Sequence, residues 1–433
     1  VGSEMCIRDR GMTDRFDMVV RGGTVVTASA RFRADVGIRG GQIEAVGDGL
    51  ATAETEVDAT GKLVMPGGVD PHCHIEQMSG MGLLNADTFE TATRSAAMGG
   101  TTTVISFAAQ HHGQQLRDVV EDYAARARRG AMIDHAFHMI VSDPDRSALT
   151  RDLPALIEAG HRSIKIFTTY NIRLDDRQVL DVMAVARRHG ALVCIHAEND
   201  GLIGWTKDQL LGAGMTRPVH HAMSHPRLAE IEAVERMIRF AEFLDQPIML
   251  YHISTVEAVD AVRRARARGL PVWAETCPHY LFMTDEVLDK PGIEGAKWMC
   301  SPPQRTEADQ EALWQALSDG DLQVVSSDHA PDRFDETGKL SAGRDVSFDK
   351  IANGLPGLEV RLPLMFDAMV SKGRLGVEKF VELTATVPAE LYGLETKGRL
   401  EPGADADIAI WDVDRETMFG EDDLHDNVGY NPW

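Results

Sequence analysis

Hydrophobic and polar positions follow one rhythm through most of this 433-residue chain. From Gly68 onward, short apolar runs alternate with amphipathic, helix-like stretches. Eight runs have strand character: GVDPHCH, TTTVISFAA, AFHMIVS, SIKIFTTY, LVCIHAEN, IMLYHIS, VWAETCP and LQVVSSDHAP. Apolar runs alternating with helices are typical of parallel sheets buried on both faces. The pattern predicts an α/β fold, a (β/α)8 TIM-like barrel over residues 67–393. A doubly wound open sheet is the competing fold, but no Gly-x-Gly-x-x-Gly opens these helices.

The two ends of the chain have a different pattern. Residues 12–66 contain β-rich runs separated by Gly-rich turns, such as DMVVRGGTVVTA, and residues 394–433 return to strand character in ADIAIWDVD. We expect both segments to build one small β-sandwich domain. Residues 1–11 show neither strand nor helix periodicity, so we interpret them as an upstream artefact or tag.

Charge and composition narrow the classes of partner. The chain has 44 basic and 67 acidic residues, a net charge of −23, which disfavours nucleic acid and anionic membranes as partners. We find neither a signal-peptide pattern nor an apolar run of membrane-spanning length, and we expect a cytoplasmic protein. The five cysteines are widely scattered, as is typical of reduced thiols.

Polar side chains gather where the predicted strands end. In a parallel barrel the active site lies at the carboxyl ends of the strands. A lone histidine there is more often structural, but a His-x-His pair on a strand points both rings to one face. Several such signals at one barrel mouth favour a metal site. Five of the eight strands contribute: His72 and His74, Lys165, His196, His252, and Asp328.

The number of candidate ligands favours two metals. Four imidazoles and one carboxylate exceed the three protein ligands of a typical catalytic zinc site. An unmodified Lys165 ammonium would be repelled by both cations, whereas a lysine carbamate is an anion that could bridge them. The alternative is that Lys165 extends to the barrel rim or pairs with a carboxylate.

Longer motifs carry a family resemblance. They include GGVDPHCH, MGGTTTVISFA, SIKIFTTY, CIHAEN, WAETCPHYLF, MCSPPQR, SSDHAP, ANGLPGLEVRLPL and HDNVGYNP. With these motifs the chain resembles the cyclic amidohydrolases of the amidohydrolase superfamily, and within them the dihydropyrimidinase/D-hydantoinase branch. The resemblance runs from about Phe16 to the last residue.

The resemblance implies a ligand set and a cofactor. His72 and His74 would bind the more buried metal, and His196 and His252 the second metal. Lys165 would be carbamylated and bridge both. Asp328 would complete the first site and act as the catalytic acid and base. The implied cofactor is two Zn²⁺ per subunit, although other divalent metals could serve.

The resemblance also implies substrate contacts and a reaction. Tyr170 would donate a hydrogen bond to the developing oxyanion, and Ser301 and Asn353 would grip the cyclic amide largely through backbone groups. The implied reaction is the hydrolytic opening of a dihydropyrimidine or 5-substituted hydantoin to the N-carbamoyl amino acid by a metal-activated hydroxide. The implied assembly is a homotetramer.

Three other classes of relative resemble this scaffold. Dihydroorotases carry an arginine at the position of Glu76, so we expect an anionic substrate to be repelled here. Allantoinases, which share His279 of CPHY and the DHAP after strand eight, are the second candidate enzymes. A metal-poor interaction scaffold of the collapsin-response-mediator type is the non-enzymatic alternative, although every expected ligand is present.

Two loops are expected to shape the pocket. The loop after strand one could form an apolar wall from Met78, Met81, Leu83 and Leu84, or only pack on the barrel. Arg173 could meet a polar substituent or face solvent.

His111 and His112 could lie at the pocket rim. We expect structural or solvent-exposed roles for His135, His138, His161, His189, His220, His221 and His225.

Overall fold

The computed structural model describes residues 15–433 and contains the predicted barrel strands. The interpretation of residues 1–11 lies outside the described part of the chain. All eight strands are parallel and follow one another in chain order. They are β6 (Gly68–Cys73), β7 (Thr101–Ala109), β8 (Asp134–Ile140), β9 (Ser163–Phe167), β10 (Leu192–His196), β11 (Ile248–Leu250), β12 (Val272–Thr276) and β13 (Val324–Val325).

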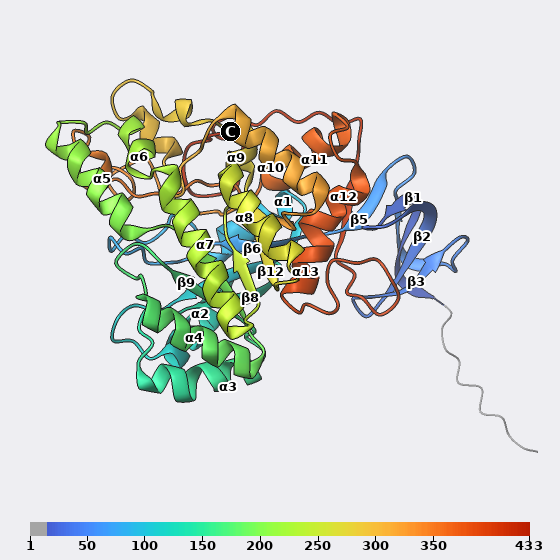
Figure 1. Cartoon of the computed structure of the whole chain (residues 1–433). Coiled ribbons are helices and arrows are strands. Elements are labelled where there is room, and N and C mark those ends of the chain that lie inside the picture. The colour runs from blue at the N-terminus through green and yellow to red at the C-terminus, as the bar shows by residue number, and fades with distance from the viewer. Residues whose placement is uncertain (1–14) are drawn as a thin grey trace, which may run out of the picture.

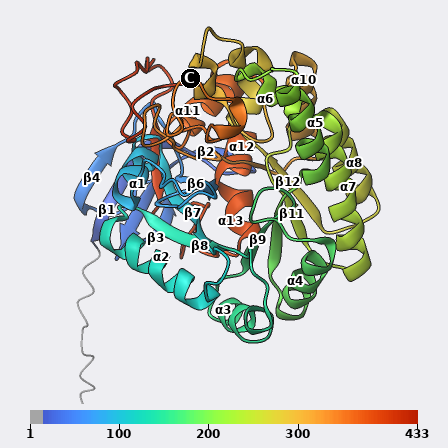
Figure 2. The same ribbon diagram turned by 90° about the vertical axis from the view of Figure 1, so that its left-hand side faces the viewer.

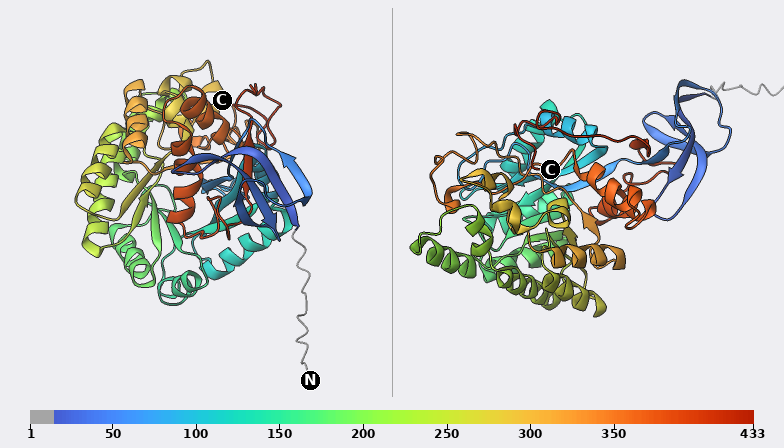
Figure 3. Two further views of the ribbon diagram at one scale, coloured as in Figure 1. Left: turned by 90° about the vertical axis from the view of Figure 1, so that its right-hand side faces the viewer. Right: turned by 90° about the horizontal axis from the view of Figure 1, so that it is seen from above.

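Helices cover the outside of this sheet, as Figures 2 and 3 show. The α-helices are α1 (Phe89–Met98), α2 (Leu116–Gly130), α3 (Leu153–Glu158), α4 (Asp176–His189), α5 (Asp200–Gly212), α6 (Val219–Ser224), α7 (Arg227–Leu244), α8 (Val256–Ala267), α9 (Pro278–Phe282), α10 (Glu307–Asp319), α11 (Arg361–Phe366), α12 (Val377–Val381) and α13 (Val387–Leu391). Short 3₁₀ or π segments are η1 (Ala148–Asp152), η2 (Asp285–Leu288), η3 (Glu294–Trp298), η4 (Phe348–Lys350), η5 (Asp367–Ser371) and η6 (Glu382–Thr386).

Local sequence explains where the helices begin and end. Helix α4 starts with a capping box in which the Asp175 side chain accepts a hydrogen bond from the backbone N–H of Gln178. It ends at Gly190, whose left-handed conformation (φ 74°) suits a residue without a Cβ. Helix α10 repeats this arrangement with Thr306 at its start and Gly320 at its end.

A buried arginine closes the barrel between its first and last strands. Arg361 is fully buried, and its guanidinium donates to the carbonyl oxygens of Val69 in β6 (3.1 Å) and Val325 in β13 (3.0 Å). A parallel bridge between Cys73 and His329 joins the same two edges further along. These contacts fix the residues that follow β13 against the end of β6.

The small domain is built from both ends of the described chain, as expected. Its strands form one six-stranded sheet with the order β14-β5-β1-β2-β3, in which β4 also pairs with β1. In Figure 1 it lies to one side of the barrel. The strands are β1 (Phe16–Val26), β2 (Arg31–Arg39), β3 (Gln42–Gly47), β4 (Ala53–Asp58), β5 (Leu63–Pro66) and β14 (Ile408–Trp411).

The length and hydropathy of the helices decide whether any of them could cross a membrane. Within residues 15–433, the structure contains no helix that is both long and apolar enough to span a bilayer.

Candidate metal centre and active site

The six predicted metal ligands all line one cavity of about 440 Å³. They come from strands β6, β9, β10, β11 and β13, or from the residues that directly follow them. The convergence expected from the strand-end pattern is therefore present in the structure. The ligands that line the cavity are His72, His74, Lys165, His196, His252 and Asp328.

The first cluster joins the two histidines of β6 to the aspartate after β13. The Nε2 atoms of His72 and His74 lie 3.0 and 3.5 Å from Oδ1 of Asp328. His72 Nδ1 pairs with the buried Glu275, and His74 Nδ1 lies 2.7 Å from the Oε1 of Gln77. An acceptor on Nδ1 keeps the proton there and leaves Nε2 free to bind a metal.

The second cluster joins His196 and His252, whose ring centroids are 4.4 Å apart. Nδ1 of His252 is buried and has no hydrogen-bond partner among the described residues. An unpaired buried nitrogen costs about 1–3 kcal/mol, and a metal ion would remove that cost. His196 Nε2 lies 2.7 Å from Oε2 of Glu198, a second buried carboxylate. The first cluster brings three ligand atoms together, as a divalent cation requires, and His196 and His252 offer two further imidazoles in the same cavity.

Lys165 lines the same cavity and is surrounded by aromatic rings. Its Nζ atom is 3.8 Å from the Tyr251 ring centroid and 4.9 Å from that of Phe167. No carboxylate of residues 15–433 lies within ion-pairing distance of it. Burial lowers the pKa of Lys165 to about 8, although Asp328 and Glu275 act to raise it. At physiological pH the neutral fraction of this amine is therefore much larger than that of an exposed lysine, and the formation of a carbamate requires the neutral form.

The pKa values of the buried site histidines shift in two directions. For His72, burial acts to lower the pKa, but the Asp328 and Glu275 carboxylates outweigh it and raise the pKa above its ordinary value. Burial and the nearby Lys165 charge lower the pKa values of His196 and His252 well below the ordinary value. Burial also lowers the pKa of His74. For Asp328, burial acts to raise the pKa, but the charge and hydrogen bond of His72 outweigh it and hold the pKa well below 3.8. Neutral imidazoles and an ionised carboxylate are the protonation states that bind metals.

Backbone strain concentrates at the same residues. Tyr170, His252 and Asp328 have φ angles of 69°, 40° and 46°, in the left-handed region that residues with a side chain seldom adopt. Such conformations cost about 1–3 kcal/mol each and are typical of functional sites. Here they direct side chains from three strand ends into the cavity.

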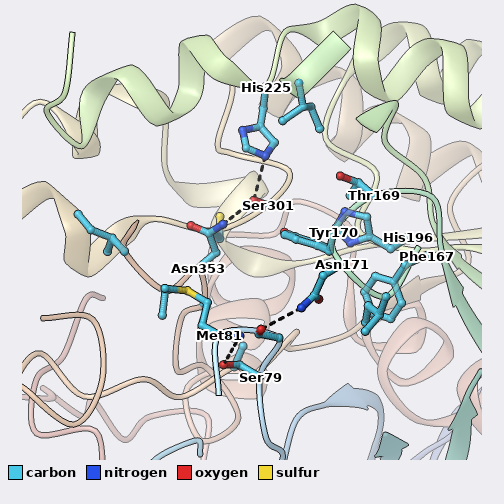
Figure 4. A pocket seen from close by; sticks show the side chains of 18 of the residues that line it. Ser79, Met81, Phe167, Thr169, Tyr170, Asn171, His196, His225, Ser301 and Asn353 are labelled. Atoms are coloured by element: carbon cyan, nitrogen blue, oxygen red, sulfur yellow. Dashed lines mark hydrogen bonds between the residues drawn. The ribbon is translucent and has the colours of Figure 1, made fainter. Parts of the chain in front are cut away.

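The three predicted substrate contacts, Tyr170, Ser301 and Asn353, line the cavity and lie next to one another in Figure 4. Asn353 Nδ2 donates to Ser301 Oγ over 3.2 Å, and that Oγ lies 3.4 Å from His225 Nε2. The other amide atom of Asn353, Oδ1, is buried and accepts no hydrogen bond from the described residues. Burial raises the pKa of the Tyr170 hydroxyl, which therefore remains a hydrogen-bond donor at neutral pH.

The loop predictions are only partly confirmed. Met81 lines the cavity, but Met78, Leu83 and Leu84 do not. Part of the remaining apolar wall is Ile172, in the second of the two loops expected to shape the pocket. Ile203, Phe348 and Ile351 come from segments for which no such role was predicted. Arg173 lies outside the cavity lining and pairs with Asp200 over 3.2 Å.

The Glu76 carboxylate does not line the cavity, so the structure does not support the expected repulsion of an anionic substrate by this side chain. Glu76 is not among the lining residues, and its carboxylate accepts a hydrogen bond from the Phe89 N–H at the start of α1 (3.0 Å). The side chain that enters the cavity at this point is the next residue, Gln77.

Four buried polar residues of the site were missed or assigned another role. A signal was available for Glu275 and Glu198, because a carboxylate inside or directly after a buried strand needs a partner. His221 and His225 were assigned structural or exposed roles, but both are buried and line the cavity beside Ser301. They lie between strands, so the strand-end pattern could not identify them.

Comparisons with known proteins agree with this geometry. The profile of the Amidohydrolase family matches residues 63–429. A D-hydantoinase from Streptomyces coelicolor is 43% identical over 424 residues, which cover 96% of this chain and 90% of the relative. A D-phenylhydantoinase from Escherichia coli is 38% identical over 421 residues, with the same two shares. The crystal structure of a dihydropyrimidinase from Brevibacillus agri is also similar, with a TM-score of 0.92 and 38% identity over 96% of this chain and 90% of that one.

Proposed function

Since the chain belongs to the amidohydrolase family, we propose that it hydrolyses cyclic amides, opening dihydropyrimidines or 5-substituted hydantoins to the N-carbamoyl amino acid. One observation carries the proposal. The ligand atoms of His72, His74 and Asp328 lie within 4.8 Å of one another at the mouth of the barrel, in a cavity that also holds Lys165. The names of its relatives, D-hydantoinase and dihydropyrimidinase, support the choice of substrate.

The cofactor that these residues fit is a pair of Zn²⁺ ions. His72, His74 and Asp328 would hold one ion, and His196 and His252 the other, with a carbamylated Lys165 shared between them. Zinc at such a site lowers the pKa of a coordinated water to near 7 and polarises a carbonyl group. The lowered pKa values of His196, His252 and the Lys165 amine support this assignment.

Asp328 is suited to move the proton of the reaction. Its carboxylate is ionised and lies at the centre of the first cluster, within 3.0 Å of His72 Nε2. It can take a proton from the attacking water and return it to the ring nitrogen as the amide bond breaks. One carboxylate thereby acts first as base and then as acid.

Tyr170, Ser301 and Asn353 are suited to hold the substrate. The Tyr170 hydroxyl keeps its proton and can donate it in a hydrogen bond to the oxygen on which negative charge develops. The free Oδ1 of Asn353 can accept a hydrogen bond from a ring N–H of the substrate. The apolar wall that includes Ile172 and Ile203 would contact a substituent on ring carbon 5.

A substrate panel tests the proposal and its alternatives. Zinc-loaded protein is expected to open dihydrouracil or 5-phenylhydantoin. Turnover of allantoin alone would move the chain to the allantoinases, and turnover of dihydroorotate alone would move it to the dihydroorotases. The homotetramer and the cytoplasmic location stay predictions, which analytical ultracentrifugation and cell fractionation check.

A further inference from the structure

A second fully buried lysine lies away from the proposed metal centre. Lys339 belongs to the long segment between β13 and α11, and its side chain has no exposed surface. Its Nζ donates to the carbonyl oxygen of Ala352 (2.9 Å) and to that of Met299 (3.4 Å). Ala352 directly precedes Asn353, and Met299 lies two residues before Ser301. One ammonium group therefore contacts the backbone of both substrate-binding segments.

The two segments are also joined directly. The Gly354 N–H donates to the Met299 carbonyl over 2.9 Å, and Asn353 Nδ2 donates to Ser301 Oγ over 3.2 Å. Lys339 adds a contact from a third segment to the same backbone carbonyl of Met299. Its two hydrogen bonds therefore restrict the distance between the backbone at Ala352 and the backbone at Met299.

Stability alone is a poor explanation for a lysine at this position. A buried charge without an ion pair costs more free energy than a well-packed apolar side chain of similar size. No carboxylate among residues 15–433 lies within 4.0 Å of Lys339 Nζ. Burial lowers the pKa of Lys339 to about 8, and the nearby buried Asp332 acts to raise it. A methionine would fill this space at lower electrostatic cost. The stability of the fold therefore does not account for a lysine here, whereas its contacts with the Ser301 and Asn353 segments give it a role in the substrate site.

We propose that Lys339 is a positioning residue, which sets the spacing between the Ser301 and Asn353 segments and thereby the fit of the cyclic amide. The inference rests on the proposed function, because it takes these segments as the substrate grip. Binding groups need to be held within about 0.5 Å of the productive geometry, and a backbone gripped from a third segment meets that need.

The test replaces the ammonium by an apolar group of similar length. In Lys339→Met the two backbone carbonyls lose a shared donor, so the KM for the best cyclic amide should rise about tenfold. We expect kcat to change less than about twofold and the zinc content to stay unchanged, because the metal ligands keep their own partners. Lys372→Met, at an exposed lysine on the barrel exterior, is the matched control and should keep the wild-type KM.

A purely structural lysine gives a different result. It would lower the melting temperature and the active fraction, and so the apparent kcat, but leave the KM unchanged. Lys339→Gln, which keeps a polar group in the same space, is measured in parallel. Because Gln retains an N–H donor, its KM should rise less than that of Lys339→Met. An unchanged KM in folded Lys339→Met, a KM in Lys339→Gln above that of Lys339→Met, or loss of folded protein in both variants would overturn the inference.

A double-variant cycle with Asn353→Ala identifies the route of the effect. If Lys339 acts through the Asn353 segment, the KM of the double variant should stay below the product of the two single effects. Independent, multiplicative effects would contradict that route.

A wild-type protein that opens no cyclic amide refutes the proposed function itself. A fully active wild type with an unaltered Lys339→Met refutes only the positioning role.

Discussion

Lys165 and Tyr251 face each other inside the barrel, with the lysine Nζ 3.8 Å from the centroid of the tyrosine ring. An aromatic face stabilises an ammonium ion less than a carboxylate at contact distance does. Lys165 is therefore a buried cation with a weak partner, and this explains why its pKa falls to about 8. The same amine, once neutral, is a nucleophile for carbon dioxide.

The low pKa of Lys165 predicts the pH dependence of carbamate formation. Only the neutral amine reacts, so below pH 8 the rate should fall about tenfold for each pH unit, and above pH 8 it should level off. Metal-free protein with ¹³C-labelled carbon dioxide at a fixed dissolved concentration, followed by the NMR signal of the carbamate carbon, measures this rate. A rate that keeps rising to pH 10 would show an ordinary lysine.

Removal of Lys165 should disrupt the metal pair. We expect Lys165→Ala to bind fewer than two zinc ions and to lose turnover, because the carbamate anion that would bridge the cations is lost. Added acetate should restore part of both, since its carboxylate fits the space left by the side chain. Lys165→Met leaves no such space and should not respond. Wild-type activity in Lys165→Ala would exclude the bridging role.

Glu275 should control zinc affinity through His72. The carboxylate holds the His72 Nδ1 proton and so orients Nε2 toward Asp328. Glu275→Leu removes this acceptor and should weaken zinc binding about 10–100-fold, measured by competition with a chromogenic chelator. Glu275→Gln keeps an acceptor without the charge and should lie between the leucine variant and the wild type. Equal affinity in all three proteins would assign Glu275 to packing alone.

Tyr170 should act mainly in the transition state. Tyr170→Phe removes one hydrogen bond to the developing oxyanion, and kcat should fall about 10²–10³-fold with a smaller change in KM and an unchanged zinc content. Tyr123→Phe, at a buried tyrosine of α2 outside the cavity, is the control and should retain kcat. A loss confined to KM would instead give Tyr170 a role in binding the ground state.

The apolar pattern of the sequence predicted the eight strands and their common mouth because both faces of a parallel barrel strand are buried. His196 and His252 were identified for that reason, since each ends such a run. Lys339 could not be found in this way, because it lies in a long irregular segment and its partners are backbone carbonyls remote in sequence.

Glu76 shows the opposite limit. Its position after the His-x-His pair suggested a side chain in the cavity, but its own φ of 48° and the N-terminus of α1 direct the carboxylate to the Phe89 N–H. The distance along the chain from His74 to Glu76 indicated where Glu76 lies in the loop. It did not indicate the direction of the Glu76 side chain. Helix capping and backbone conformation decided that direction.

Ring opening by the zinc-loaded protein tests the central claim most directly. Protein shown by metal analysis to carry two zinc ions per chain is mixed with dihydrouracil or 5-phenylhydantoin, and the N-carbamoyl product is followed by liquid chromatography. We predict turnover that disappears on chelation of the metal and returns when zinc is restored. Folded protein that carries two zinc ions per chain and opens neither ring would contradict the claim.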